Sequence, residues 1–212
     1  MVFFQGARGR LHYRTWLADS AGPVAAVEFL PGSGQHSGHY HRLGRALSGR
    51  GIHVWCLDTS GQGLSEGDPA EPGTLTELVA DAATLARLIR AECPGIPFFP
   101  AGHSLGAATC LAAADLPDLE GAGMILIGTP KSALAAAPRI PSELPVLALH
   151  GVDDRRAPID PVREWAGRNG SVGLHEYPDS GHDLLHEPVH AAVTIDIARW
   201  IHTVAGRTAE VG

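Results

Sequence analysis

The segment FFPAGHSLGAATC, residues 98–110, is an apolar run that breaks at Gly102 and continues at once as a stretch of small residues. Gly102 and Gly106 stand two residues before and two residues after Ser104. A turn from strand to helix that is tight enough to expose a serine at its tip leaves no room for side chains at those two positions. The segment therefore predicts a strand, a sharp turn at Ser104 and a helix. The free N–H groups at the start of such a helix stabilise negative charge beside the serine oxygen.

Apolar runs and helical patterns alternate along the rest of the chain. The apolar runs are short and almost continuous, which is typical of strands buried on both faces of a parallel sheet. They cover residues 24–30, 52–58, 97–103, 123–129 and 145–151. Segments with helical spacing of apolar residues lie at 39–50, 74–93, 105–116 and 190–204. This alternation predicts an α/β fold with a doubly wound, mostly parallel sheet and helices on both faces.

Two further local patterns refine this prediction. Thr74 and Glu77 have the spacing of a capping box, which predicts that a helix starts directly after Thr74. Residues 10–22, RLHYRTWLADSAG, indicate an antiparallel strand at the edge of the sheet that leads into a turn.

Composition restricts the class of protein. The 212 residues contain no linker-like stretch, and we expect a single domain over residues 1–212. The net charge of -7 argues against a nucleic-acid partner. No run approaches the roughly 20 apolar residues of a membrane span, and the N-terminus is unlike a secretory signal. We therefore expect a soluble, cytoplasmic protein with no integral membrane segment. Cys56, Cys93 and Cys110 are expected to be small core residues.

Candidate partners for Ser104 follow later in the chain. Asp153 and Asp154 come just after the apolar run that ends at residue 151, and His182 is expected just past another buried strand. A nucleophilic serine needs a histidine as base and a carboxylate to orient that base. When the serine lies in a strand–turn–helix of this kind, the chain order is serine, acid, histidine. The order found here fits, and either aspartate could be the acid.

Five motifs in one order strengthen the case. They are PGSGQHSGHYHRLGRALSGRG (31–51), DTSGQGLSEGD (58–68), AGHSLG (101–106), LHGVDDRRAP (149–158) and YPDSGHDLLHEP (177–188). With these motifs the chain resembles the α/β-hydrolase superfamily, and within it the monoacylglycerol lipase-like, serine aminopeptidase-type hydrolases. The resemblance extends over most of the chain.

The resemblance implies a role for several residues. It makes Ser104 the nucleophile, His182 the general base and Asp154, rather than Asp153, the orienting acid. It also implies that the backbone N–H groups of Ser33 and Leu105 form an oxyanion hole. No cofactor and no metal are implied.

Two departures from the family pattern affect the expected function. Pro31-Gly32 stands where the family usually has His-Gly, which weakens the assignment of Ser33. The family usually carries a long cap after the strand at 123–129, whereas this chain has only KSALAAAPRIPSE there, residues 131–143. A minimal, cap-less enzyme follows. We expect a serine hydrolase that cleaves small-molecule carboxylic esters of short to medium acyl chains through an acyl-enzyme.

Other functions are also compatible with parts of this sequence. A thioesterase or an amidase would use the same three residues. A non-catalytic ligand-binding protein with this fold is a rival from another class, although the three residues are intact. A dinucleotide-binding domain would use Gly32, Gly34 and Asp58, but Ser37 occupies the position of its third glycine. His36, His39 and His41 suggest a metal site only weakly, because no carboxylate or thiolate accompanies them.

Overall fold

The computed structural model describes residues 2–19 and 22–211, and all of its strands join one sheet in the order β1-β2-β4-β3-β5-β6-β7-β8. The strands are β1 (Val2–Gly6), β2 (Gly9–Trp16), β3 (Ala25–Leu30), β4 (Ile52–Leu57), β5 (Phe98–His103), β6 (Met124–Ile127), β7 (Val146–Gly151) and β8 (Val172–Tyr177). Neighbours from β4 through β8 pair in parallel, whereas β1–β2 and β2–β4 pair antiparallel. The predicted mostly parallel sheet is confirmed.

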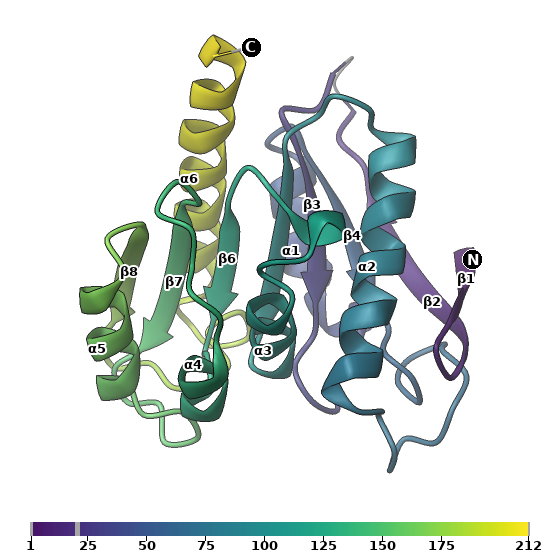
Figure 1. The fold of residues 1–212 in the computed structure, drawn as a ribbon, viewed down its shortest axis with the longest axis horizontal. Helices are drawn as coiled ribbons and strands as arrows, with labels where there is room; N and C mark the ends of the chain where they lie inside the picture. The colour runs from purple at the N-terminus through teal and green to yellow at the C-terminus, as the bar shows by residue number, and fades with distance from the viewer. Residues whose placement is uncertain (1, 20–21, 212) are drawn as a thin grey trace.

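Helices cover both faces of this sheet. They are α1 (His41–Ser48), α2 (Leu75–Glu92), α3 (Leu105–Ala112), α4 (Lys131–Ala136), α5 (Asp160–Arg168) and α6 (His190–Val211), with short 3₁₀ helices η1 (Ser37–Tyr40) and η2 (Pro117–Leu119). Figure 1 shows α2, α3, α4 and α5 in front of the sheet and α1 and α6 behind it. The fold is therefore doubly wound. The prediction of one domain over residues 1–212 stays a prediction, which the single sheet supports.

The position of strand β3 explains why apolar and polar residues do not alternate in its sequence. Successive side chains of a strand point to opposite faces, and both faces of β3 are covered. Val27 and Phe29 pack in the core under α1 and α6, while Ala26 and Leu30 pack in the core under α2 and α3. Every residue of β3 is buried. An unbroken apolar run is the expected pattern for such a strand.

The regular elements match the sequence prediction more closely than the irregular ones. The capping box is present, since Glu77 N–H donates to Thr74 Oγ1 at 3.3 Å and Thr74 N–H donates to Glu77 Oε2 at 2.7 Å. Strand β2 is antiparallel as predicted, but it is not the edge of the sheet, because β1 pairs outside it. The three cysteines are free, with Cys56 and Cys110 buried.

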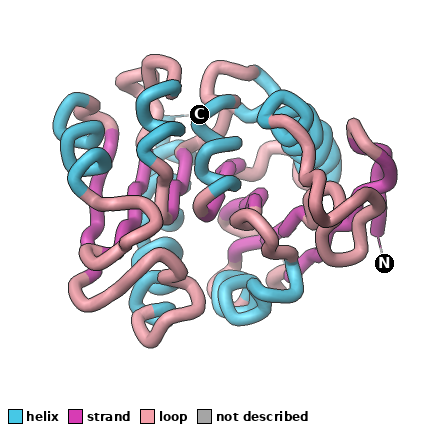
Figure 2. Tube along the Cα trace, turned by 90° about the horizontal axis from the view of Figure 1, so that it is seen from below, coloured by secondary structure: helices cyan, strands magenta, loops and turns pink. Residues whose placement is uncertain are grey.

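The parallel strands all end on one edge of the sheet. This edge is the lower one in Figure 1, and Figure 2 views it from below, where loops crowd between the helices. In sheets of this type the ligand-binding residues gather at the carboxyl ends of the strands. The connection from β6 to β7, residues 128–145, consists of the short α4 and its flanking loops. No cap domain is inserted in this stretch, all of which the structure describes.

One buried carboxyl group in the core has no hydrogen-bond partner among the described residues. Glu28 lies in the middle of β3 at 0% exposure, and neither of its carboxyl oxygens has a hydrogen-bond partner within residues 2–19 and 22–211. Burial raises the pKa of Glu28 well above its ordinary value of 4.5, and the charge of Arg90 only partly opposes this. The folded chain therefore favours the protonated carboxyl, whereas the unfolded chain releases the proton above about pH 4.5.

Replacing Glu28 with methionine is expected to stabilise the protein in a pH-dependent way. Because the folded pKa is raised, Glu28 costs stability only as pH rises above its unfolded pKa. The variant should gain free energy of unfolding at pH 7, and much less of that gain should remain near pH 4.5. Urea unfolding of both proteins at the two pH values measures this. An equal gain at both would show that Glu28 is not the titrating group.

Candidate active site

Ser104 stands at the turn between β5, which ends at His103, and α3, which begins at Leu105. Its backbone has φ 52° and ψ -108°, a conformation that a residue with a side chain rarely adopts. A Cβ on Gly102 would lie 2.2 Å from the carbonyl carbon of Gly106, and a Cβ on Gly106 would lie 1.9 Å from the carbonyl oxygen of Leu30. Both glycines are thus needed for α3 to pack this closely, and the turn holds Ser104 at the carboxyl edge.

Ser104, His182 and Asp154 form one hydrogen-bonded line. His182 Nε2 lies 2.9 Å from Ser104 Oγ, and His182 Nδ1 lies 2.7 Å from Asp154 Oδ2. When Nδ1–H donates to the carboxylate, Nε2 is free to accept the serine proton. Asp154 is 4% exposed and His182 is 8% exposed, so the carboxylate and the ring are largely shielded from water. This arrangement can make a serine hydroxyl nucleophilic.

The structure distinguishes the two candidate aspartates. Asp154 is buried, and besides His182 its Oδ1 accepts hydrogen bonds from the N–H groups of Arg156 and Ala157, both at 2.8 Å. Asp153 is exposed, and its N–H donates to the carbonyl of Ser180 at 3.0 Å. The carboxylate within hydrogen-bond distance of His182 Nδ1 therefore belongs to Asp154. The loop that carries His182 begins after β8, which is half-exposed rather than buried as expected.

The two expected oxyanion donors lie beside Ser104. Ser33 lines the same cavity as Ser104, and Leu105 is the first residue of α3. In the part of the chain that the structure describes, neither of these N–H groups donates to a carbonyl or a side chain. Ser33 lies in a turn that is closed by a hydrogen bond from Gln35 N–H to the carbonyl oxygen of Gly32, with an N–O distance of 3.0 Å. Such a turn can hold a backbone donor in place without the histidine that the family usually has there.

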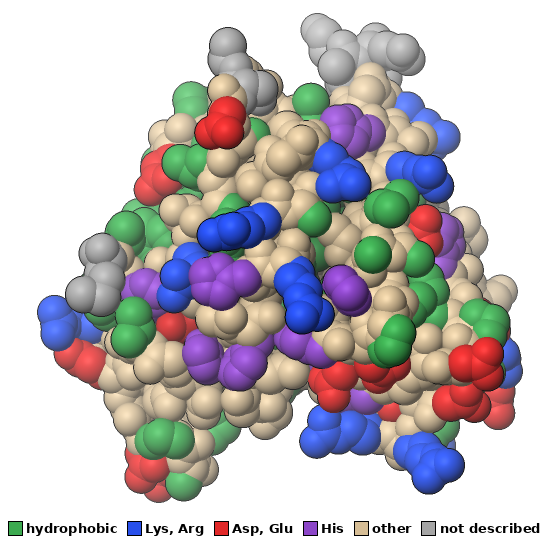
Figure 3. All heavy atoms as spheres, turned by 180° about the vertical axis from the view of Figure 1, so that it is seen from behind, with side chains coloured by type: hydrophobic (Ala, Val, Ile, Leu, Met, Phe, Trp, Pro, Cys, Tyr) green, Lys and Arg blue, Asp and Glu red, His purple; other side chains and the backbone are tan. Residues whose placement is uncertain are grey.

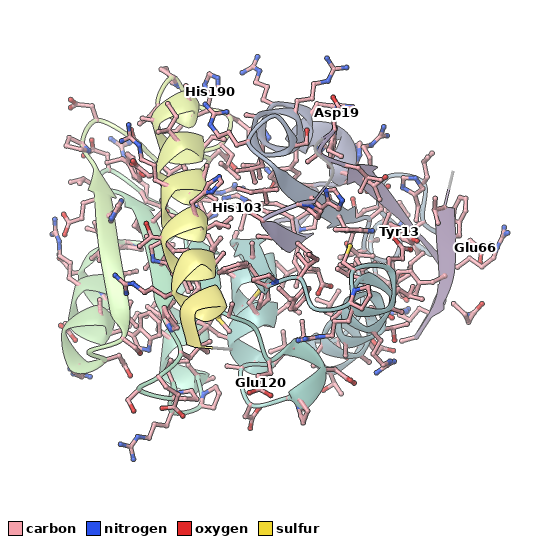
Figure 4. The ribbon with its side chains drawn as sticks, turned by 90° about the horizontal axis from the view of Figure 1, so that it is seen from above. Tyr13, Asp19, Glu66, His103, Glu120 and His190 are labelled. Carbon is pink, nitrogen blue, oxygen red and sulfur yellow. The ribbon has the colours of Figure 1, made fainter. Side chains whose placement is uncertain are left out.

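A buried network around His103 was not predicted from the sequence. His103 Nε2 lies 3.0 Å from the carbonyl oxygen of His182, and its Nδ1 lies 3.0 Å from Gln35 Oε1 and 3.3 Å from Tyr40 Oη. Tyr40 Oη donates to Gln35 Oε1 and accepts from Gly32 N–H at 3.4 Å. Figure 4 labels His103, which lies well inside the outline of the molecule. The network ties the Ser33 turn, the Ser104 turn and the His182 loop together.

Burial determines the charge of His103. It lowers the pKa of His103 to about 4, so the ring carries a single proton at neutral pH. The single proton can serve the carbonyl oxygen of His182 from Nε2 or Gln35 Oε1 from Nδ1, because both of these oxygens can only accept. The one available signal in the sequence was an imidazole at the end of an apolar strand, directly before Ser104.

Asp58 is the candidate ribose-binding residue of the dinucleotide alternative. Both of its carboxylate oxygens have hydrogen-bond partners within the protein. Its Oδ2 lies 2.9 Å from His12 Nδ1 and accepts from Leu64 N–H at 3.0 Å, and its Oδ1 accepts from Ser37 N–H at 2.6 Å. Burial alone would raise the pKa of Asp58, but the hydrogen bonds from Leu64 and Ser37 lower it. At 1% exposure this carboxylate cannot reach a ligand. It anchors the loop between β3 and α1 instead.

The histidine cluster has structural partners of its own. His36 caps η1 by accepting from Gly38 N–H at 3.1 Å, and His39 Nδ1 accepts from His36 N–H at 3.1 Å. His41 stacks edge-on against Trp16. Figure 3, which views the face of α1 and α6, shows histidines gathered among basic side chains. Across the described residues, no group of three or more histidine, cysteine, aspartate or glutamate side chains could hold a metal ion.

Two hollows flank Ser104. One is a cavity of about 270 Å³ with a largely polar wall, lined by Gly32, Ser33, Gln35, His103, Ser104, Pro130, Arg156, Ala157, His182 and Asp183. The other is an apolar groove of about 550 Å³ between α3 and α4, and Leu105 is one of the residues that line it. The groove is lined by Leu75, Leu105, Ala108, Ala112, Asp115, Ser132, Ala133, Ala136, Ala137 and Pro138. Ser104 lines the polar cavity, and the next residue, Leu105, lines the apolar groove.

Comparison with known proteins identifies the family of the chain. A family model described as "Serine aminopeptidase, S33" matches residues 21–142. A monoacylglycerol lipase of Mycolicibacterium smegmatis is 24% identical and aligned over 93% of this chain and 95% of that protein. A human monoglyceride lipase is 35% identical over 62% of this chain, but the match spans only 46% of the human protein.

The fold is also found among solved structures. A Xanthomonas campestris protein described as an α/β serine hydrolase without lid has a TM-score of 0.74 and 22% identity. The superposition covers 97% of this chain and 93% of that one. The predicted α/β-hydrolase fold is confirmed. No helix among residues 2–19 and 22–211 is long and apolar enough to cross a membrane.

Proposed function

The chain belongs to the serine aminopeptidase, S33 family, and we propose that it cleaves carboxylic esters of short to medium acyl chains through an acyl-enzyme on Ser104. It is a serine hydrolase of the monoglyceride lipase or esterase type. The observation that carries the proposal is the hydrogen-bonded line from Ser104 Oγ through His182 to the buried carboxylate of Asp154. A non-catalytic binding protein would not require this hydrogen-bonded arrangement of serine, histidine and aspartate.

The reaction proceeds in two acyl transfers. Ser104 Oγ attacks the ester carbonyl carbon while its proton passes to His182 Nε2. Asp154 accepts the Nδ1–H hydrogen bond and stabilises the imidazolium. The N–H groups of Ser33 and Leu105 hold the negative oxygen of the tetrahedral intermediate, and each such donor contributes roughly 3 kcal/mol to transition-state stabilisation. His182 then gives its proton to the leaving alcohol. Water activated by His182 releases the acid.

The apolar groove supports the expected acyl preference. Leu105, whose N–H is the proposed oxyanion donor, directly follows Ser104 and lines the groove, so the groove is the proposed place for an acyl chain attached to Ser104. Its walls are mainly alanine side chains of α3 and α4, and Leu75 is 44% exposed at its border. No cap domain is inserted in residues 128–145, so no such domain shields the groove from solvent. Long acyl chains would leave apolar surface in water and gain little from each added carbon.

A series of p-nitrophenyl acetate, butyrate, octanoate and palmitate tests this preference. We expect kcat/KM to be highest for butyrate or octanoate and to fall for palmitate. Ala108→Phe narrows the groove and should reduce octanoate turnover about tenfold more than acetate turnover. Ala91→Phe, on the exposed face of α2, is the matched control and should alter neither. Equal or faster hydrolysis of emulsified long-chain triglycerides would refute the proposed acyl range.

A further inference from the structure

Charge is unevenly distributed over the surface of the protein. Although the net charge is -7, residues 29–57 contain three arginines and no aspartate or glutamate. These residues include α1, which packs beside α6 behind the sheet (Figure 1). In α6, residues 190–207 contain a single acid, Asp196, whose carboxylate accepts from Tyr177 Oη at 2.8 Å. The face formed by α1 and α6 is therefore basic, and Figure 3 shows basic and histidine side chains gathered over it.

The exposed arginines of this face differ from those elsewhere in lacking carboxylate partners. Within the described residues, no carboxylate pairs with Arg42, Arg45, Arg50 or Arg199. Arg50 Nη1 donates to the carbonyl oxygen of Ala46 at 2.7 Å, and the remaining guanidinium donors of these residues are available to a ligand. On other parts of the surface, exposed arginines pair with carboxylates at N–O distances of 3.3 Å or less, as in Arg8–Glu71, Arg10–Glu66, Arg87–Asp118, Arg163–Glu176 and Arg168–Glu164.

A hollow of about 650 Å³ is lined by two of these unpaired arginines. It lies between the end of α1 and the second half of α6, and its lining residues are Arg50, Ile195, Ala198, Arg199, His202 and Thr203. Arg199 and His202 are three positions apart, so they lie on the same side of the helix. His202 Nε2 donates to the carbonyl oxygen of Arg50 at 3.0 Å, which holds the end of α1 against α6. The lining residues, all of which the structure describes, thus include two guanidinium groups and no carboxylate.

This hollow is remote from the proposed active site. Arg50 comes just before β4, which starts at Ile52, so it lies near the amino ends of the parallel strands. Ser104 and Asp154 instead follow the carboxyl ends of β5 and β7. Helix α6 also runs away from the carboxyl edge toward its C-terminal end (Figure 1). A ligand in the hollow therefore does not contact Ser104 and is not the ester that Ser104 attacks.

The donors in the hollow fit an anion that has several oxygen atoms. Each guanidinium presents N–H donors in a planar fork that matches two oxygens of a carboxylate or a phosphate. One fork already engages both oxygens of a carboxylate, whereas a phosphate group has enough oxygens for two forks. We infer that the hollow between α1 and α6 is a binding site for a phosphate group, held by Arg50 and Arg199. The inferred site is independent of the proposed ester hydrolysis.

Calorimetric titration with inorganic phosphate tests the site, with sodium chloride used to keep the ionic strength constant so that general screening does not change. We expect saturable binding with a Kd of about 1 mM or lower. Arg50→Gln and Arg199→Gln each remove the charge and the fork but keep a polar side chain. Each should raise Kd by about 10- to 100-fold, the range for hydrogen bonds to charged groups.

Arg42→Gln is the matched control. It removes the same charge from an exposed, unpaired arginine of the same face that does not line the hollow, and Kd should stay within about twofold of the original. The midpoint of thermal unfolding verifies that all three variants are folded. Equal weakening by all three substitutions would show a general effect of surface charge and would overturn the site. Phosphate binding that survives both Arg50→Gln and Arg199→Gln would overturn it as well.

Sedimentation with vesicles distinguishes two sources of the phosphate group, a small soluble molecule and a phospholipid headgroup. Vesicles of phosphatidylcholine mixed with phosphatidylglycerol are compared with vesicles of phosphatidylcholine alone. Binding to the mixed vesicles that is lost in Arg199→Gln and kept in Arg42→Gln would identify the headgroup as the ligand. Binding of inorganic phosphate without binding to vesicles would identify a soluble ligand. Absence of binding to both probes by the folded protein would contradict the inference.

Discussion

Replacing Ser104 with alanine is expected to lower kcat for a short ester by roughly 10⁴- to 10⁶-fold, because no other group can form the acyl-enzyme. Alanine fits the same turn, since both residues carry a Cβ, so the fold should persist. Stopped and steady-state kinetics on p-nitrophenyl butyrate measure the loss. Circular dichroism and the midpoint of thermal unfolding verify that the variant is folded.

Two further variants test whether the loss of activity is specific to Ser104 and whether Ser104 acts together with His182. Ser48→Ala changes a serine whose Oγ donates only to the carbonyl of Arg45 at 3.2 Å, and its rate should stay within about twofold of the original. His182→Ala combined with Ser104→Ala should cost no more than Ser104→Ala alone, because the two residues act as one unit. A residual rate above about one hundredth in Ser104→Ala would mean that another nucleophile performs the chemistry.

Replacing Asp154 with asparagine is expected to lower kcat by roughly 10⁴-fold at neutral pH. An asparagine oxygen can still accept from the N–H groups of Arg156 and Ala157, so the loop should keep its shape. The neutral amide, however, cannot stabilise the imidazolium of His182, and it permits the tautomer in which Nε2 carries the proton. That tautomer cannot accept the proton of Ser104.

The neighbouring residue provides the matched control for this variant. Asp153→Asn changes the same charge one position earlier on an exposed side chain, and its kcat should stay within about threefold of the original. Parallel measurement of kcat and KM for both variants separates their effects. A larger loss in Asp153→Asn than in Asp154→Asn would contradict the assignment of the acid.

The parts of the fold that the sequence predicted are those with a strong local cause. The buried strands β3 to β7 are apolar on both faces, and α2 has both amphipathic spacing and a capping box. Gly102 and Gly106 mark the turn at Ser104, because the clash at each position is unavoidable. These features depend on few neighbours, so a single sequence is enough to recognise them.

The parts that were missed depend on the assembled structure. Helix α4 was not predicted, and it has no buried residue and so no clear apolar pattern. The strand expected before His182 is present as β8, but it is mainly exposed, with only Tyr177 buried. Strand β1 is mainly exposed and is held by its pairing with β2. The role of His103 depends on contacts with Gln35 and with the carbonyl of His182, which are 68 and 79 residues away in the chain. No local pattern reports such contacts.

The choice between Asp153 and Asp154 is another feature that the local sequence pattern does not decide. Both residues follow β7 in the expected place, and in the sequence only the resemblance to known hydrolases favours Asp154. The structure separates them because the chain after Gly151 turns one carboxylate toward His182 and the other toward solvent. A difference of one position in a loop is decided by backbone geometry rather than by residue type.

The most direct test of the central claim is the intact mass of the protein after incubation with a small fluorophosphonate, followed by peptide mapping. The account predicts one stoichiometric adduct, located on Ser104 and absent from Ser104→Ala. An adduct on another serine, or no adduct on the folded protein, would contradict it, because an activated Ser104 flanked by His182 and Asp154 must react.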